Sequence, residues 1–313
     1  MTKTKRHPLL SLLLLVLFSL AGATIFTTLG MILGGIIYGF KEVAEALSIP
    51  TWNVDETNIA LLKIMHIFSS FGMFVVASLA FAKKESKNWK AYLELNISSN
   101  TLFALTMLIM IVASPLLEWT MLLNQKTHLP DIFKGLEDWM RTKEDIAADL
   151  TKKMLIMTSL NTFLFNLLAL AVIPAIGEEL IFRGCLQRIF GRWFGNNHLS
   201  IWLTAFIFSA VHMQFFGFLP RMLLGALFGY LLLWSKSLWL PILAHFINNA
   251  IVVLAAYVYQ QKGLPIDQID QTMPSPKIVY LLSFAATGIL LYIFHRQSLS
   301  QINNQANNGT ELG

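Results

Sequence analysis

The sequence predicts an all-α fold, a polytopic transmembrane helix bundle with about eight spans. Only 13% of the 313 residues are charged and 55% are apolar, whereas soluble domains usually carry about 25% charged residues. The apolar residues gather in stretches that are long enough to cross a hydrocarbon layer about 30 Å thick. These stretches cover residues 9–39, 60–82, 101–123, 155–177, 199–216, 218–234, 237–259 and 277–295.

The first stretch begins like a secretory signal peptide. Basic residues precede a leucine run, and the small residues 21–23 form a candidate cleavage site. The apolar run continues to Phe40 instead of stopping there, so we expect an uncleaved first span. Its second half contains two GxxxG spacings, which favour close helix packing. They are formed by Gly30, Gly34, Gly35 and Gly39.

The charges in the connections predict an orientation. Basic segments at the start, at 83–90 and at 183–192 alternate with acidic or balanced segments at 41–59 and 124–154. By the positive-inside rule, we expect a multi-pass protein of a bacterial inner (cell) membrane with both termini cytoplasmic. The formal net charge of +5 is spread over loops and no nucleic-acid motif is present. We therefore expect membrane lipid, and no nucleic acid, as a partner.

The chain divides into three predicted parts: 1–154 with the first spans, a core at 155–259, and 260–313 with a last span and a tail. The connections 85–98 and 130–154 mix apolar residues with charges at helical spacing, as interfacial helices do. For 130–154 we favour a plain solvated helix over a cap on the outer face. The polar tail after Ser298 is predicted to be disordered. The one cysteine, Cys185, permits no intrachain disulfide and is expected to be a small buried residue.

Three short polar motifs interrupt the apolar second half of the chain. They are Glu178-Glu179-x-x-x-Arg183, Phe208-x-x-x-His212 and His245-x-x-x-Asn249. Residues four apart lie on one face of a helix. Because ionisable groups within membrane spans are costly, they usually serve a function. We therefore expect the three motifs to converge on one site within the membrane.

The first motif separates its two carboxylates. Pro174 and Gly177 precede it, which predicts a kinked or broken helix end. Glu179 and Arg183 are spaced for an ion pair. Glu178 lies about 100° away around the helix and is free to act as a general base. A cluster of these charges at the lipid headgroups is the alternative interpretation.

Two mechanisms fit the combined residues. In one, Glu178 and His212 activate a water that attacks a peptide carbonyl, while His245 and Asn249 donate hydrogen bonds to the oxyanion. In the other, Glu178, His212 and His245 bind Zn²⁺, which lowers the pKa of its bound water. The chain lacks HExxH, the stronger zinc signature, and the two mechanisms are equally compatible with the sequence. In membranes, histidines can also simply bond a neighbour and asparagines can join helices.

The order EExxxR, FxxxH and HxxxN across several spans resembles the CPBP family (CAAX protease and bacteriocin-processing, or Abi), which includes CAAX prenyl endopeptidases. The motifs lie within 155–259, about a third of the chain. The resemblance implies an all-helical intramembrane endopeptidase, which is either a metalloprotease or a metal-free glutamate protease. It implies these roles: Glu178 as the base, His212 as its assistant, His245 and Asn249 as oxyanion donors, and Glu179, Arg183 and Phe208 as support.

The resemblance also indicates the kind of substrate. Eukaryotic members act on prenylated CAAX proteins, so we expect a membrane-associated protein or peptide. The main alternative is a non-catalytic immunity or scaffold protein that binds a peptide in the same cavity. A proton-coupled transporter is a third hypothesis, since intramembrane glutamate and histidine residues can relay protons.

The expected helix boundaries contain one geometric conflict. Glu178 is expected near the cytoplasmic end of the fourth span, whereas His212 lies about 20 Å deep in an upright fifth span. The two side chains can meet only if the real boundaries differ from these.

Overall fold

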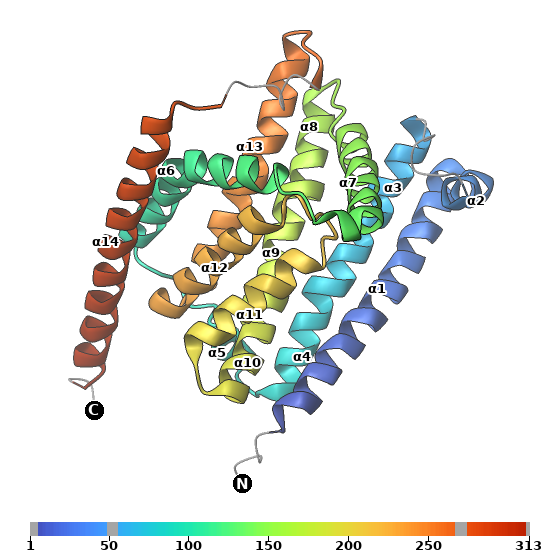
Figure 1. Cartoon of the computed structure of the whole chain (residues 1–313). Coiled ribbons are helices and arrows are strands. Elements are labelled where there is room, and N and C mark those ends of the chain that lie inside the picture. Colours follow the sequence, from blue (N-terminus) through green and yellow to red (C-terminus); the bar gives the residue numbers. More distant parts are fainter. Residues whose placement is uncertain (1–5, 49–55, 267–273, 311–313) are drawn as a thin grey trace.

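The computed structural model describes residues 6–48, 56–266 and 274–310, and all regular elements within these ranges are helices (Figure 1). The predicted fold class is therefore confirmed. Seven of the described helices are long and apolar enough to span a membrane. They are Pro8–Tyr38, Thr57–Glu85, Asn100–Gln125, Leu160–Phe194, Phe218–Ser235, Trp239–Gln261 and Lys277–Asn304.

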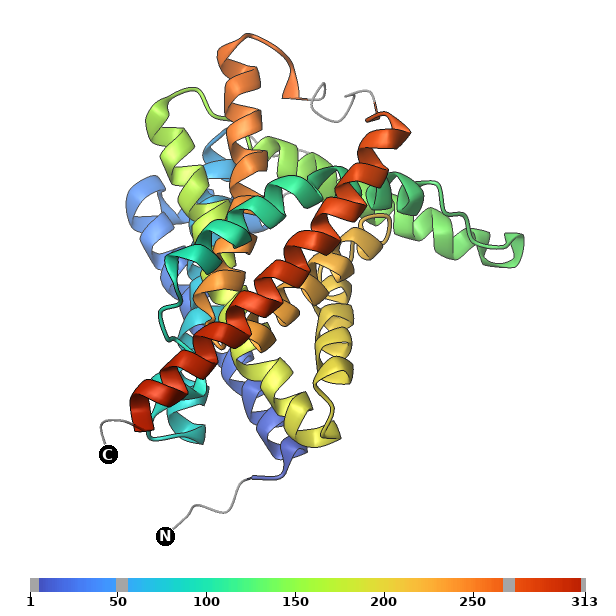
Figure 2. The same cartoon turned by 90° about the vertical axis from the view of Figure 1, so that its left-hand side faces the viewer.

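These spans correspond to the labelled elements as follows. The first is α1 (Pro8–Tyr38), and the second joins α3 (Glu56–Ser70), the π-helix η2 (Phe71–Val76) and α4 (Ala77–Glu85). The third is α6 (Asn100–Gln125), and the last three are α12 (Phe218–Ser235), α13 (Trp239–Gln261) and α14 (Lys277–Thr310). Figure 2 shows α14 crossing α6 obliquely on one side of the bundle, and α1 begins at the same end where α14 finishes.

The Leu160–Phe194 span differs most from the sequence prediction. It was expected to end at residue 177, but the helix continues for a further 17 residues to Phe194. Two π-helical stretches, η4 (Leu168–Val172) and η5 (Leu180–Leu186), flank α9 (Ile173–Glu179), with α8 (Leu160–Leu167) before and α10 (Gln187–Phe194) after. Such π-helical turns accommodate local irregularities in the hydrogen-bond ladder, here next to Pro174, without ending the helix. Glu178 consequently lies about midway along the span.

This change of boundary brings His212 to the level of Glu178. The fifth predicted span, 199–216, is the shorter α11 (Asn197–Ala210). Gly195 adopts a φ of 63°, in the left-handed region that glycine favours, and the chain reverses there between α10 and α11. α11 therefore runs back along the preceding helix for about 20 Å. His212 lies just after its end, in the loop 211–217, rather than inside a span.

α12 is fastened to the long helix at two points with the same spacing. Arg183 Nη2 donates to the carbonyl of Gly225 at 3.2 Å, and Gln187 Nε2 donates to that of Gly229 at 3.3 Å. Both acceptors belong to glycines, whose missing side chains let the donors reach the backbone. A Cβ at Gly229 would lie 2.8 Å from Gln187 Oε1. This contact holds α12 against the helix that carries Glu178.

α1 packs closely on α3, η2 and α4 through glycines. Gly30 and Gly34 lie against α3, as their spacing predicted, whereas Gly39 has a φ of 106° and ends α1. The closest approach is between Gly22 and Gly72, where an added Cβ on Gly22 would lie 2.2 Å from the Gly72 carbonyl oxygen. This backbone contact leaves no room for any side chain.

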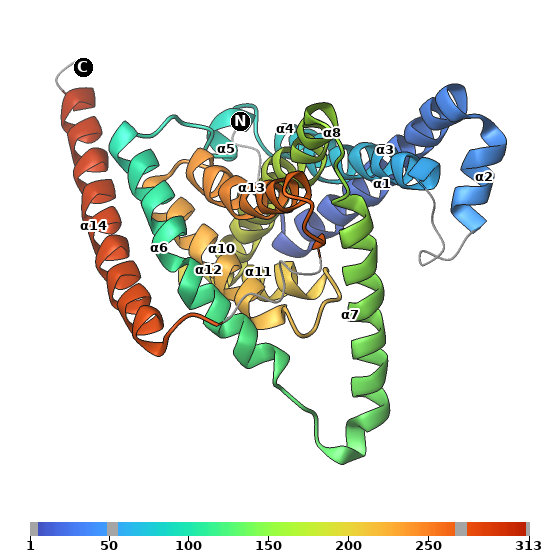
Figure 3. The same cartoon turned by 90° about the horizontal axis from the view of Figure 1, so that it is seen from above.

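The remaining elements differ in part from expectation. Residues 130–154 form the short η3 (Asp131–Phe133) and α7 (Lys134–Met154), which extends away from the bundle in Figure 3. The 85–98 connection was predicted as an interfacial helix, but its helical part is the four-residue α5 (Trp89–Tyr92). Ser86 and Leu95–Ser99 on either side are not helical. α2 (Phe40–Ser48) follows α1. α14 continues to Thr310, where the sequence predicted a disordered tail.

Glu137 anchors the turn that connects α6 to α7. It accepts hydrogen bonds from Arg141 at 2.6 and 2.9 Å and from the Leu129 N–H at 2.8 Å, and it contacts His128 at 2.9 Å. The Arg141 guanidinium, followed by the Leu129 N–H, lowers the pKa of Glu137 to about 2. The carboxylate therefore stays charged at any ordinary pH, and α7 keeps a fixed starting point.

The Gly22–Gly72 contact predicts a steric test. Gly22→Ala and Gly72→Ala should each lower stability by about 1–3 kcal/mol, because the new methyl group must push two helices apart. The matched control is Gly288→Ala in α14, where nothing lies within 4 Å of the added Cβ. Thermal unfolding in detergent should show a lower midpoint for the first two variants and an unchanged or higher one for the control. An equal response of all three would contradict the close packing.

Candidate active site

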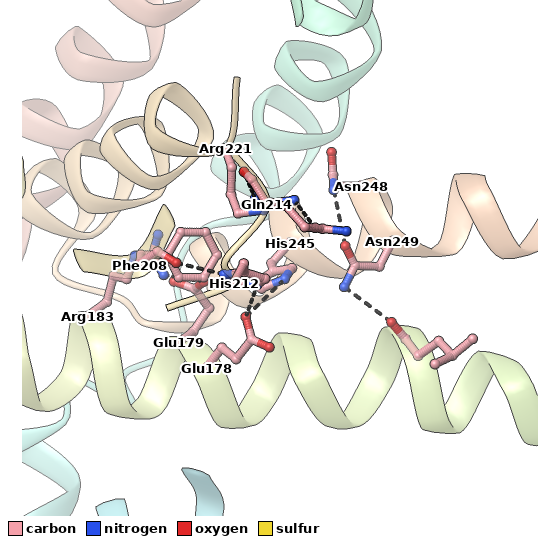
Figure 4. A network of polar contacts seen from close by, with 11 residues as sticks. Glu178, Glu179, Arg183, Phe208, His212, Gln214, Arg221, His245, Asn248 and Asn249 are labelled. Carbon is pink, nitrogen blue, oxygen red and sulfur yellow. Dashed lines mark hydrogen bonds and ion pairs between the residues drawn. The ribbon is translucent and has the colours of Figure 1, made fainter. Parts of the chain in front are cut away.

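The three motifs converge on one cavity within the bundle (Figure 4). Glu178 Oε2 lies 4.0 Å from His212 Nε2 and 3.8 Å from His245 Nε2. Glu178 comes from α9, His212 from the loop after α11, and His245 from α13. The cavity has a volume of about 600 Å³, and Asn249 also lines it. The sequence prediction that these residues meet agrees with the structure.

The Phe208-x-x-x-His212 motif orients the histidine ring. His212 Nδ1 lies 2.7 Å from the carbonyl oxygen of Phe208. A carbonyl can only accept, so Nδ1 carries the proton, and Nε2 faces Glu178 and has a free lone pair when the ring is neutral. The Phe208 ring contacts His212 edge to face at 5.1 Å. Phe208 thus supports the site through both its carbonyl and its ring.

The loop that carries His212 is held from two sides by other helices. Asn124 of α6 donates to the Phe215 carbonyl at 3.2 Å and accepts from the Leu219 N–H at 2.7 Å. On the second side, Glu144 of α7 accepts from the Phe216 N–H at 2.9 Å. These side chains satisfy backbone groups that no helix supplies, so α6 and α7 fix the position of His212.

A buried ionic network orients His245. Glu179 Oε1 lies 2.8 Å from His245 Nδ1 and 2.8 Å from Arg183 Nη1. The Glu179 and Arg183 side chains are both 0% exposed. The guanidinium also lies over the rings of Phe208, at 4.4 Å, and Phe228, at 5.3 Å. The predicted ion pair is therefore present, and it directs His245 Nε2 toward Glu178.

Asn249 takes the place of a missing helical hydrogen bond. In a regular α-helix the Leu170 carbonyl would accept from residue 174, but Pro174 has no N–H. Asn249 Nδ2 donates to this carbonyl at 3.2 Å instead, and Asn248 Nδ2 donates to Asn249 Oδ1 at 3.1 Å. An amide carries two donor hydrogens, so Asn249 keeps one N–H beyond the Leu170 contact.

Arg221 and Gln214 also line the cavity and were not predicted as part of the site. Arg221, at the start of α12, lines the cavity, and its guanidinium donates to Gln214. Figure 4 shows this pair on the far side of the two histidines from Glu178. The sequence signal for each was a polar residue within an apolar stretch, Gln214 near the end of 199–216 and Arg221 at the start of 218–234. Cys185 is fully buried in the core and does not line the cavity.

The donor set was tested against a zinc ion. Zinc ligands at about 2.0–2.1 Å in a tetrahedral arrangement lie roughly 3.3 Å from one another. The carboxylate-to-imidazole separations of 3.8 and 4.0 Å are wider. Among the described residues, no group of three or more His, Cys, Asp or Glu side chains is arranged to hold a metal ion. The residues as placed do not fit a three-ligand zinc site.

The site lies in a segment of the chain that is similar to a known protein family. Residues 160–251 match the family model described as Type II CAAX prenyl endopeptidase Rce1-like. Over 90 residues the chain is 29% identical to "Uncharacterized protein YpbD" of Bacillus subtilis (strain 168). The aligned segment covers 28% of this chain and 43% of that protein. The chain thus aligns with less than half the length of this relative. No solved structure matches it.

All three motifs lie within the matched residues, so the resemblance drawn from them is confirmed over 160–251. The matched model describes a family of Type II CAAX prenyl endopeptidases. The seven apolar helices agree with an integral membrane protein.

The buried network predicts a large cost when Arg183 is removed. Arg183→Met should destabilise the protein by about 3–5 kcal/mol, because Glu179 is left as a charge with one partner fewer in the core. The matched control is Arg188→Met, since Arg188 is 31% exposed and pairs with Glu94 at 3.0 Å. That loss should stay below about 1 kcal/mol. Thermal unfolding of both variants and of Glu179→Gln/Arg183→Met is the measurement. Equal losses at Arg183 and Arg188 would contradict the network.

Proposed function

We propose that the protein is an intramembrane endopeptidase that hydrolyses a peptide bond in a membrane-associated protein or peptide. The observation that carries this proposal is the position of Glu178 Oε2, which faces the Nε2 atoms of two histidines inside a cavity about midway along the Leu160–Phe194 span. Glu178 Oε2 is buried and has no hydrogen-bond partner among the described residues. Burying such a carboxylate oxygen costs free energy, so its presence within a span indicates a function.

The geometry supports activation of water by Glu178 and His212. A water that bonded Glu178 Oε2 and His212 Nε2 would span their 4.0 Å separation at ordinary hydrogen-bond lengths. Glu178 takes the water's proton while the oxygen attacks the peptide carbonyl, whose π electrons move to its oxygen. When the C–N bond breaks, its electrons remain on nitrogen, and Glu178 returns the proton to the leaving amine.

His245 and Asn249 are the proposed donors to the oxyanion. His245 Nδ1 donates to Glu179, so Nε2 can donate as well only when the ring is an imidazolium. Asn249 supplies the N–H that Leu170 does not use. These two donors would stabilise the tetrahedral intermediate.

The cavity favours a substrate with a carboxylate, such as the free end of a CAAX-like tail. Arg221 lines the cavity and donates to the neutral Gln214, and it forms no ion pair with the described residues. A carboxylate could accept two parallel hydrogen bonds from the guanidinium. The apolar lining, which includes Leu117, Leu224 and Val252, fits the hydrophobic residues next to such an end.

The proposed orientation places the start of α1 in the cytoplasm of a bacterial cell. Arg6, from the start of α1, and Arg192, from α10, both pair with Glu85 at the end of α4, at 3.2 and 2.9 Å. Lys83 and Lys84 lie in the same last turn of α4. Such a basic end is typical of the cytoplasmic side.

The first test is peptide cleavage by detergent-purified variants. Glu178→Gln should abolish cleavage and His212→Ala should reduce it by about 10²-fold or more, because each removes a group that contacts the attacking water. Both should keep the thermal unfolding midpoint of the wild type within a few degrees. The control is Glu118→Gln, a second carboxylate of the cavity that bonds Ser275 and Tyr280 instead of the histidines. Full activity of Glu178→Gln would overturn the proposal.

Metal content is measured on the same preparations. Wild type that cleaves with no bound metal, and resists chelators, would support the water activation derived above. Stoichiometric zinc that disappears together with activity in Glu178→Ala and His245→Ala would instead establish a metallopeptidase, with the three donors drawn closer together than in this structure.

The role of Arg221 is tested with paired peptides that differ only at the C-terminus. The wild type should cleave the free acid with a kcat/KM about 10- to 100-fold higher than the amide, since a charge-assisted hydrogen bond contributes about 1.5–3 kcal/mol. Arg221→Gln should remove this preference, whereas Arg188→Gln, outside the cavity, should keep it. Equal cleavage of acid and amide by the wild type would exclude carboxylate recognition.

A further inference from the structure

A second cavity lies at the opposite end of the bundle from the start of α1 (Figure 1). It has a volume of about 420 Å³ and is formed where the end of α1, the first turns of α3, the end of α7 and the start of α8 meet. None of its lining residues lines the cavity of Glu178. Whatever it binds is therefore separate from the proposed peptidase site.

Lys63 of α3 is the unusual residue of this cavity. Its side chain lines the cavity, yet Lys63 is only 7% exposed within a membrane span. It has no hydrogen bond or ion pair among the described residues, and no acidic side chain lines the cavity. Lysines near the ends of spans usually extend their amine to the interface, but this one is enclosed. An enclosed ammonium without a counter-charge is costly, which points to an anion that enters the cavity.

The start of α8 adds a second feature that attracts anions. Asn161 and Thr162, in the first turn of α8, line the cavity opposite Lys63. α8 has a capping box at Ser159, and it continues as the Leu160–Phe194 span. The partial positive charge at the N-terminus of a long helix favours an anionic group beside it. Lys153, which pairs with Asp149 at 3.0 Å, also lines the cavity and adds a second ammonium.

The rest of the lining suits an acyl chain. Ile156 and Phe165 line the cavity and are 45% and 38% exposed on the outer surface of the bundle, where lipid surrounds a spanning helix. Tyr38, 40% exposed at the end of α1, borders the same opening and is a residue that membrane interfaces favour. The Lys63 ammonium can therefore bind the phosphate of a phospholipid, while the exposed apolar side chains at the opening contact its acyl chain.

We propose that this cavity binds a phosphate group, held by Lys63 and the start of α8, and that an anionic phospholipid supplies it. Basic pockets between transmembrane helices bind lipid headgroups in this way. Inorganic phosphate shares the chemistry of the headgroup but would leave the apolar mouth unused. The site does not depend on the proposed peptidase activity.

The test measures lipid binding to the full chain by native mass spectrometry from detergent. Phosphatidylglycerol, phosphatidylcholine and inorganic phosphate are each titrated against the wild type, Lys63→Met and Lys41→Met. Lys41 is the matched control, since its side chain is 84% exposed near the same end of the bundle. We expect the wild type and Lys41→Met to bind phosphatidylglycerol at least tenfold more tightly than phosphatidylcholine, and Lys63→Met to lose this difference.

Each outcome has a definite meaning. Inorganic phosphate that binds through Lys63 as tightly as the lipid would keep the phosphate site but assign it to the free ion. Unchanged phosphatidylglycerol binding in Lys63→Met, or no preference in the wild type, would overturn the proposal. Thermal unfolding in lipid-free detergent shows whether Lys63→Met is folded, and we expect its midpoint to equal or exceed that of the wild type. Should that variant fail to fold, Asn161→Leu tests the start of α8 by the same titration.

Discussion

The structure depends on the ionic network of Arg183, Glu179 and His245 at the centre of the bundle. Water cannot solvate a guanidinium at this depth, so its hydrogen bonds must come from the protein. Arg183 obtains two of them, from Glu179 and from the Gly225 carbonyl of α12, while its Nε has no partner among the described residues. Glu179 in turn holds His245 of α13. One buried cation therefore fixes three helices relative to one another, and Glu178, the next residue along the chain, is placed against His245 as a consequence.

A second constraint arises from Pro174, which removes one donor from the helix that carries both glutamates. The Leu170 carbonyl would remain unsatisfied in the membrane, a cost of several kcal/mol. The Asn249 amide satisfies it from α13. The helix can then pass through the proline without ending, which keeps Glu178 at mid-depth. Asn249 accordingly joins two helices, which was the alternative role considered for it from the sequence, and keeps one remaining N–H for chemistry.

The sequence was sufficient for whatever depends on spacing within one helix. The interval of four residues predicted the Glu179–Arg183 ion pair, and the apolar stretches predicted the spans that carry the first and third motifs. It was not sufficient where a tertiary partner decides. Pro174 and Gly177 favoured a helix end at 177, and only the partner on α13 and the adjoining π-helical stretches allow the helix to reach Phe194. The depth conflict between Glu178 and His212 followed directly from that boundary. Gln214 belongs to none of the three motifs, and only the structure places it beside Arg221.

The site also relies on residues beyond the segment that matches the family model. The loop with His212 and Gln214 is bonded by Asn124 and Glu144, and Arg141 lies 4.0 Å over the Phe216 ring. These residues belong to α6 and α7, outside 160–251. Glu178, Glu179 and His245, by contrast, contact one another within the matched segment. The bonds that orient the two glutamates and His245 are therefore independent of α7, whereas the loop that forms one wall of the cavity is not. A change in α7 can reshape the part of the cavity next to His212 and Arg221 while leaving the ionic network intact.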